Sequence, residues 1–313
     1  MGYGSYSYEA HRAITTARTS KPAQRVFAQR ECHPMMNPFG VRVRESRDSA
    51  QHPESLGIVF ALDVTGSMGA IPEALARREL PELMKLLGEH GVADPQVLFV
   101  AVGDAVGDRA PLQIGQFEST AELMDQWLTW CWLEGGGGRG DFESYELALY
   151  FAARHVDMDC YRKRKKRGYL FLTGDEKPYP HLSRHIVKQV LGEELERDLP
   201  LPVLVDEVQR AFEPFFLIPD LERRAGCERA WRDALGDRVV CMESPADTAL
   251  VAAGLVALNE GLCDLDAIAA KLKDGGVERR RVGAIARALM PFAATLRADG
   301  APEPAIDSAR SLL

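Results

Sequence analysis

Long apolar runs are missing from this chain of 313 residues. The longest are of strand length, well short of the roughly 20 apolar residues that a membrane-spanning helix needs. The first residues include Tyr3, Tyr6, Tyr8 and Glu9, where a secretion signal would have a basic patch and then an apolar stretch. We therefore expect a protein with no membrane span and no export signal, located in the cytoplasm.

Positive charge is in deficit, and closely paired cysteines are absent. The chain has 38 Lys and Arg against 46 Asp and Glu, a formal net charge of -8, so it lacks the basic field that drives non-specific binding to nucleic acid or to anionic membranes. Its six cysteines are scattered and include no CxxC pair, which is typical of reduced thiols and not of a disulfide or zinc framework. We expect neither a nucleic-acid nor a membrane partner.

Nucleotide-binding motifs are lacking in usable form. Gly135, Gly137 and Gly140 satisfy the pattern GxGxxG, but they follow a predicted helix and not a first strand, which argues against a dinucleotide site. No Walker A motif is present, because Asp141 stands where its lysine would follow. The glycines therefore predict a loop without a nucleotide cofactor.

Apolar runs and helical patterns alternate in the middle of the chain. The apolar runs are residues 58–62, 97–102, 168–172, 215–218 and 239–241. The helical patterns between and around them are residues 71–89, 121–133, 144–156, 182–191 and 222–235. Apolar strands buried on both faces and alternating with helices are typical of an α/β fold with a doubly wound, mostly parallel sheet. Several of these strands run into an aspartate, so we expect acids to gather at the carboxyl edge of the sheet.

The texture of the sequence divides the chain into three regions. Residues 1–55 mix Tyr, Ser, Arg and Pro, and predict an N-terminal arm with one short helix. Residues 56–259 form the α/β domain. Residues 260–313 are rich in Ala and Leu and predict a C-terminal helical extension.

The most specific local pattern is Asp63-Val64-Thr65-Gly66-Ser67, directly after a predicted strand and before a predicted helix. One carboxylate and two hydroxyls at alternate positions of a tight turn can direct three oxygens at one point, as a small, hard divalent cation requires. Asp63-x-Thr65-x-Ser67 resembles the metal-ion-dependent adhesion site (MIDAS) of von Willebrand factor A domains, of the intracellular bacterial type.

In that family a second loop supplies a threonine, and a third loop supplies an aspartate after the fourth strand. The resemblance assigns the third-loop aspartate to Asp175, which follows the run at 168–172. The second loop corresponds to residues 135–144, where no threonine follows the glycines. Either Asp141 or Glu143 takes the place of that hydroxyl, directly or through water, or the metal keeps an additional water molecule. The candidate ligands are therefore Asp63, Thr65, Ser67, Asp175, Asp141 and Glu143.

The resemblance implies a function as well as a fold. Such a site holds Mg²⁺ (or Mn²⁺) with one coordination position open, and an Asp or Glu of a partner protein fills it. The implied protein is a non-enzymatic adaptor that works beside an AAA+ ATPase, a kinase or a phosphatase. One alternative is a metal-assisted hydrolase with His181 or His185 as the base. Another is a structural subunit of an oligomer with a vestigial site.

Two further groups of charged residues each have a structural and a functional interpretation. Asp104 and Asp108 either border the metal site or serve turn chemistry. The basic run at 162–167 precedes the fourth strand, which places it at the edge opposite the metal. It is either a solvated loop or a contact for an acidic partner or for nucleic acid.

Overall fold

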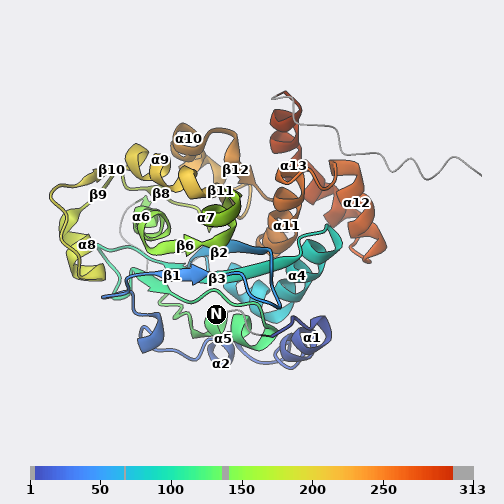
Figure 1. Ribbon diagram of the computed structural model, residues 1–313, viewed down its shortest axis with the longest axis horizontal. Helices are drawn as coiled ribbons and strands as arrows, with labels where there is room; N and C mark the ends of the chain where they lie inside the picture. Colours follow the sequence, from blue (N-terminus) through green and yellow to red (C-terminus); the bar gives the residue numbers. More distant parts are fainter. Residues whose placement is uncertain (1–3, 67, 136–140, 299–313) are drawn as a thin grey trace, which may run out of the picture.

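The central sheet has six strands (Figure 1) in the order β12-β11-β7-β2-β3-β4. The computed structural model describes residues 4–66, 68–135 and 141–298, and the account below concerns these residues. The strands are β2 (Ser55–Asp63), β3 (Asp94–Val102), β4 (Leu112–Ile114), β7 (Gly168–Thr173), β11 (Phe212–Ile218) and β12 (Val239–Cys241). All neighbours pair in parallel except β3 and β4. The predicted doubly wound, mostly parallel sheet is confirmed.

The strand order reverses between β2 and β7. From β2 the chain proceeds outward to β3 and β4, then returns to the other side of β2 and proceeds outward through β7, β11 and β12. In open α/β sheets a ligand crevice lies at such a switch point, beyond the carboxyl ends of the strands. Asp63 is the last residue of β2, and Asp175 follows β7 closely. The topology therefore places both predicted metal ligands at the switch point.

Helices cover both faces of the sheet, and its strands β2, β7 and β11 are buried along their whole length. On one face Phe99, Phe60, Phe171 and Phe215 stack in a row across four strands, with ring centroids 5.2–6.0 Å apart. Phe292 of α13 (Arg279–Ala298) packs edge-on against that row. Helix α4 (Leu80–Glu89) packs against α11 (Thr248–Asn259). Helix α6 (Tyr145–His155) packs against α9 (Leu201–Ala211) in another part of the molecule (Figure 1).

Most predicted elements are present, but several parts of the structure differ from the prediction. The pattern at 71–89 is not a uniform α-helix: α3 (Ala70–Ala74) continues through a π-helical turn (Leu75–Glu79) into α4. The edge strand β4 and the helix α9 were not predicted. Three residues are too few for a strand pattern, whereas the helical spacing of Leu201, Leu204, Val205 and Val208 was present in the sequence and was missed. The other helices are α1 (Tyr8–Thr16), α2 (Ala23–Val26), α5 (Ala121–Trp130), α7 (Asp159–Arg164), α8 (Arg184–Leu191), α10 (Arg224–Leu235) and α12 (Leu265–Asp274).

The N-terminal arm lies against the α/β domain. The Tyr8 hydroxyl donates to Glu82 of α4 at 2.6 Å, and Arg18 forms an ion pair with Asp125 of α5. Further along, β1 (Arg44–Ser46) pairs in parallel with β6 (Val156–Met158). These contacts tie the arm to the domain at widely separated positions.

The pH dependence of stability should reflect His11, a buried imidazole in this arm. Burial and the charge of Arg18 lower the pKa of His11 to about 4. The unfolded chain, with an ordinary pKa near 6.5, then binds more protons than the folded chain between about pH 6.5 and pH 4, so stability is lost as the pH falls through that window. From pH 6 to pH 5 this loss amounts to about 1 kcal/mol.

Urea unfolding of His11→Asn at the two pH values should therefore show a decline smaller than that of the wild type by this amount. His185→Asn, at an exposed histidine, measures the effect of removing an imidazole from the surface. Equal declines in the wild type and in His11→Asn would contradict a neutral, buried His11.

The basic run at 162–167 lies at the amino edge of the sheet, as predicted. Arg164 donates to the carbonyl oxygen of Ser55, the first residue of β2, whereas Asp63 ends that strand about 26 Å away. Lys163 and Arg164 form ion pairs with Asp48 at 3.1 and 2.8 Å. All six residues of the run are exposed, as a solvated segment requires, but residues 162–164 belong to the end of α7 instead of a loop, and charges of the run pair with neighbouring acids.

In the described ranges, no helix combines the length and the apolar character needed to cross a membrane.

Candidate metal centre

The first loop folds around the carboxylate of Asp63, which is fully buried. Its Oδ1 accepts hydrogen bonds from the backbone N–H of Thr65 at 2.9 Å and from the Thr65 hydroxyl at 2.6 Å. Burial raises the pKa of Asp63 to about 6, and the charge of Asp175 adds to that rise against the hydrogen bonds. Ser67, the third predicted oxygen donor of this loop, lies outside the described residues.

Tyr145 supplies the contact that the sequence did not reveal. It is the first residue of α6, and its hydroxyl donates to Oδ2 of Asp63 at 2.6 Å. The ring is buried edge-on against Phe216 and Trp231. A Cβ atom at Gly174 would lie 1.8 Å from the Tyr145 hydroxyl oxygen, so only glycine fits there. The only sequence feature that could have indicated this contact is Gly174, directly before Asp175, because a glycine there leaves space for another side chain.

The two candidate acids of the second loop have opposite environments. Glu143 is 2% exposed, and its Oε2 has no hydrogen-bond partner among the described residues. Asp141 has a side chain 80% exposed, which forms an ion pair with Lys177 at 3.3 Å. The structure therefore favours Glu143 over Asp141 as the acid that stands in for the missing threonine.

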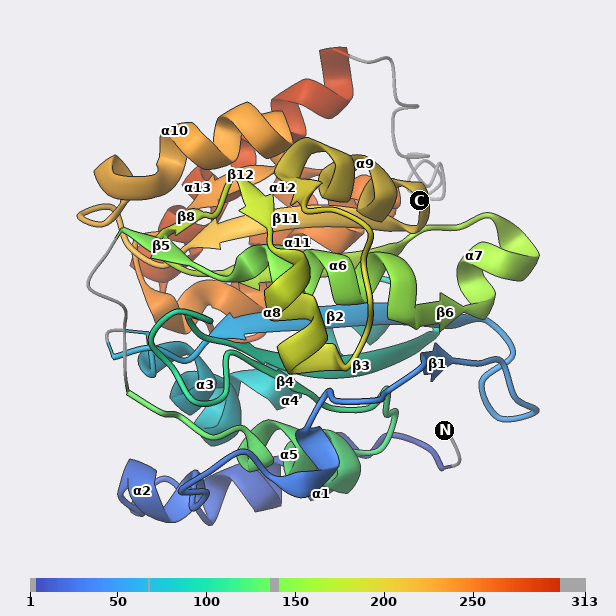
Figure 2. The ribbon, with the colours of Figure 1, turned by 90° about the vertical axis from the view of Figure 1, so that its left-hand side faces the viewer.

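A short strand pairing joins the second loop to the third. β5 (Phe142–Glu143) pairs in parallel with β8 (Lys177–Pro178), two short strands that are labelled in Figure 2. In this pairing Glu143 lies opposite Pro178. Burial raises the pKa of Glu143 to about 9, and the charges of Asp63 and Asp104 contribute. Acidic side chains are therefore crowded at this edge of the sheet, and their burial and mutual repulsion disfavour the ionised form of Glu143.

The third loop contributes Asp175, which is largely buried. Its carboxylate forms an ion pair with Nη1 of Arg223, a residue of the loop between β11 and α10. Sequence reasoning missed Arg223, because an arginine 48 positions downstream gives no local sign of its partner.

Asp104 and Asp108 combine both of their predicted roles. Oδ2 of Asp108 accepts from the backbone N–H of Asp104 at 2.8 Å, and Oδ1 of Asp104 accepts from the N–H of Val106 at 3.1 Å. This is the turn chemistry that the sequence indicated. Oδ1 of Asp104 also accepts from the Tyr179 hydroxyl at 3.1 Å, and the charges of both acids act on Glu143. They thus border the candidate site.

The chemistry of the donor set suits a hard divalent cation. Among the described residues, no three His, Cys, Asp or Glu side chains are arranged to hold a metal by themselves. Hydroxyl oxygens would have to complete the set, and Thr65 presents one beside Asp63. The buried, unpartnered oxygen of Glu143 within range of the Asp63 charge is the observation that fits a bound cation. The residues present therefore fit the predicted metal.

The two histidines considered as general bases lie elsewhere. His181 in β9 (His181–Leu182) and His185 in α8 are both exposed. In the described part of the chain neither imidazole forms a hydrogen bond with Asp63, Glu143 or Asp175.

Comparison with known proteins gives distant structural neighbours. No family model and no curated protein matches the chain. A von Willebrand factor type A structure from Catenulispora acidiphila is 14% identical, with 66% of this chain and 43% of that chain covered and a TM-score of 0.42. Proximal thread matrix protein 1 from the mussel byssus, with a zinc-occupied MIDAS motif, is 12% identical, with 69% and 48% covered and a TM-score of 0.41.

The pilus adhesin SpaC from Lactobacillus rhamnosus GG is 11% identical, with 68% of this chain and 31% of that chain covered and a TM-score of 0.42. The chain thus spans less than half the length of each of these three proteins. At such identities the likeness concerns the fold.

Proposed function

We propose that this chain, whose fold is of the von Willebrand factor A type, binds a divalent metal ion at the switch point of its sheet and there docks a carboxylate of a partner protein. The observation that carries the proposal is the buried Glu143 oxygen without a partner, beside the buried Asp63. A carboxylate removed from water is costly unless it is paired or coordinates a metal, so the arrangement favours a cation.

The metal-holding residues would be Asp63, Thr65, Asp175 and Glu143, with Ser67 proposed from the sequence pattern. Carboxylate and hydroxyl oxygens are the ligands that Mg²⁺ and Mn²⁺ prefer. A bound cation with mainly neutral direct ligands would supply net positive charge and an open position for an outside carboxylate.

The chain's own groups prepare that position. Thr65 and Tyr145 hold opposite oxygens of the Asp63 carboxylate, so it cannot rotate. The pairing of β5 with β8 holds Glu143 against the third loop. Preorganised ligands of this kind lower the entropy cost of binding.

Exposed apolar side chains flank the site. Val106 follows β3 and is 74% exposed, and Leu221 follows β11 and is 50% exposed. β3 and β11 lie on either side of the β2 and β7 pair, so these side chains lie on opposite sides of the acidic centre. A charged centre between apolar contacts suits the anchoring of a protein partner.

The proposed role is binding and not catalysis, because neither histidine contacts the acidic centre in the described residues. The partner class, an AAA+ ATPase, a kinase or a phosphatase in the cytoplasm, is proposed from the family resemblance alone.

Capture of partners from cell extract by the immobilised protein tests this function. We expect a partner that is bound with Mg²⁺ and released by EDTA. Leu221→Asp should weaken its capture about tenfold or more, because burying one leucine side chain contributes roughly 1.5–3 kcal/mol. Leu262→Asp changes a leucine of similar exposure, 42%, in the loop after α11, and should have little effect. Capture that is insensitive both to EDTA and to Leu221→Asp would defeat the proposal.

A further inference from the structure

Arg223 links two carboxylates at the carboxyl edge of the sheet. Its Nη1 forms an ion pair with Asp175, while its Nε lies 3.0 Å from Oδ2 of Asp220. The backbone N–H of Arg223 also donates to Oδ1 of Asp220 at 3.0 Å. The side chain is 35% exposed, whereas that of Asp175 is largely buried. The guanidinium is thus anchored at the rim and reaches inward to the third loop.

The guanidinium also reaches the first loop. Nη1 of Arg223 lies 4.0 Å from the Sδ atom of Met68, which follows the Asp63-x-Thr65 turn. The loop after β11 and the loop after β7 are neighbours, because the two strands are adjacent in the sheet. A cation held on Asp175 and in contact with Met68 therefore lies between the first and third loops, where the proposed metal would bind.

Electrostatics prevents the two cations from sharing this place. Asp63 and Asp175 are close enough for the charge of one to raise the pKa of the other, so their edge needs a counter-charge. A guanidinium cannot lose its proton in a protein, so it supplies one fixed positive charge. A divalent ion bound to Asp175 would face that charge at short range, in a partly buried setting where repulsion is strong.

We propose that Arg223 is a built-in cation that occupies Asp175 in the metal-free protein, and that a divalent metal must displace it to bind. This inference rests on the proposed metal site. Asp220 keeps the displaced guanidinium at the rim through its contacts with Nε and with the backbone, so the residue switches between two positions. The apparent metal affinity is reduced by the fraction of molecules in which Arg223 holds Asp175.

Calorimetric titration of the purified, full-length protein with Mn²⁺ and with Mg²⁺ tests the displacement. Arg223→Gln should bind each metal at least about tenfold more tightly than the wild type, because the competing cation is gone. Arg224→Gln is the matched control: it removes one positive charge from the adjacent position, where the side chain is 53% exposed and paired with Glu228. Its metal affinity should stay within about twofold of wild type.

A third variant distinguishes competition between Arg223 and the metal for Asp175 from a general loss of structure. Arg223→Lys keeps a positive charge at this position but cannot reproduce the two contacts of the guanidinium with Asp175 and Asp220, so its metal affinity should lie between those of the wild type and Arg223→Gln. Circular dichroism and thermal unfolding without metal show whether each variant folds.

The outcomes distinguish the proposed metal site from the proposed displacement of Arg223. If the wild type and Arg223→Gln bind metal equally well, the metal site stands and the displacement is wrong. Weaker binding by Arg223→Gln would mean that Arg223 supports the site, which also overturns the displacement. If neither binds any metal, the proposed function itself fails. Binding by Arg223→Gln alone would support the displacement in its strongest form.

Discussion

Asp63→Asn is expected to abolish the gain in thermal stability that Mg²⁺ or Mn²⁺ confers on the wild-type protein. A ligand that binds only the folded state at about 100 times its dissociation constant adds about 2.7 kcal/mol to the free energy of unfolding. Asp63 ends β2 and is the acid around which the first loop is folded, so its charge is central to that affinity. Thermal unfolding with and without metal measures the difference.

Asparagine preserves the shape of the site, so the variant should fold. Its side-chain oxygen can still accept from Thr65, and the Tyr145 hydroxyl can rotate to accept from the amide. Without metal, the loss of a buried charge whose pKa is raised to about 6 should change stability little. A large loss of metal-free stability would point to a structural role for Asp63 instead.

Two further variants test which acid of the second loop contributes to metal binding. Glu143→Gln should reduce the metal-induced gain, since Glu143 is the buried acid of that loop. Asp141→Asn makes the same charge change at the exposed acid and should keep the gain. If Asp141→Asn loses the gain and Glu143→Gln retains it, the assignment of the second-loop acid is reversed.

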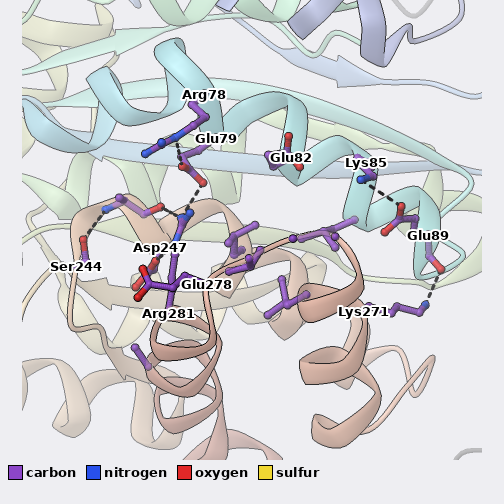
Figure 3. Close-up of a pocket in the computed structure, with 18 of the residues that line it drawn as sticks. Arg78, Glu79, Glu82, Lys85, Glu89, Ser244, Asp247, Lys271, Glu278 and Arg281 are labelled. Carbon is purple, nitrogen blue, oxygen red and sulfur yellow. Dashed lines mark hydrogen bonds and ion pairs between the residues drawn. The ribbon is translucent and has the colours of Figure 1, made fainter. Parts of the chain in front are cut away.

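Arg281→Ala is expected to destabilise the protein by about 3 kcal/mol, because it removes the partner of the buried Asp247 and one of the two arginines that pair with the buried Glu79, the other being Arg78. Arg281 of α13 pairs with Asp247 at 2.6 Å and with Glu79 at 3.0 Å, and both acids are almost fully buried. Figure 3 shows this cluster at a cavity of about 760 Å³, with Arg281 between the two acids. Burial already raises the pKa of Glu79, and Arg281 opposes that rise.

Urea unfolding at neutral pH measures the loss. Arg287→Ala is the control on the same helix: its ion pair with Glu243 is exposed and should contribute less than about 1 kcal/mol. At acidic pH the difference in stability between Arg281→Ala and the wild type should narrow, because the pKa of Glu79 is raised and a protonated Glu79 no longer needs the arginine. Equal losses for the two variants at neutral pH would contradict a structural role for the buried cluster.

The Arg281 cluster depends on a local feature that the sequence pattern does not contain. The periodicity at 71–89 predicts one regular helix, whereas a π-helical turn ends at Glu79. The turn ends at the buried Glu79, which pairs with the neighbouring Arg78 at 3.1 Å and with Arg281, more than 200 residues later, at 3.0 Å. The apolar periodicity of residues 71–89 spans several helical turns, so it does not reveal that one of them is a π-helical turn.

Local sequence was sufficient for five of the six strands of the central sheet and for part of the site. Continuous apolar runs ending in an acid are local patterns, and parallel strands bring their carboxyl ends to the same edge, so Asp63, Thr65 and Asp175 were correctly expected there. The position of the basic run at the opposite edge followed from the same rule, since it precedes β7.

Tertiary structure alone decided the rest of the site. Asp141 and Glu143 are two positions apart, and only the pairing of β5 with β8 buries one and exposes the other. Tyr145 reaches Asp63 because Gly174 leaves room for its hydroxyl, and Arg223 reaches Asp175 because β11 lies beside β7. Each of these contacts joins loops that are distant along the chain. The sequence by itself therefore determined which acids lie at the carboxyl edge, and three-dimensional packing determined what lies next to them.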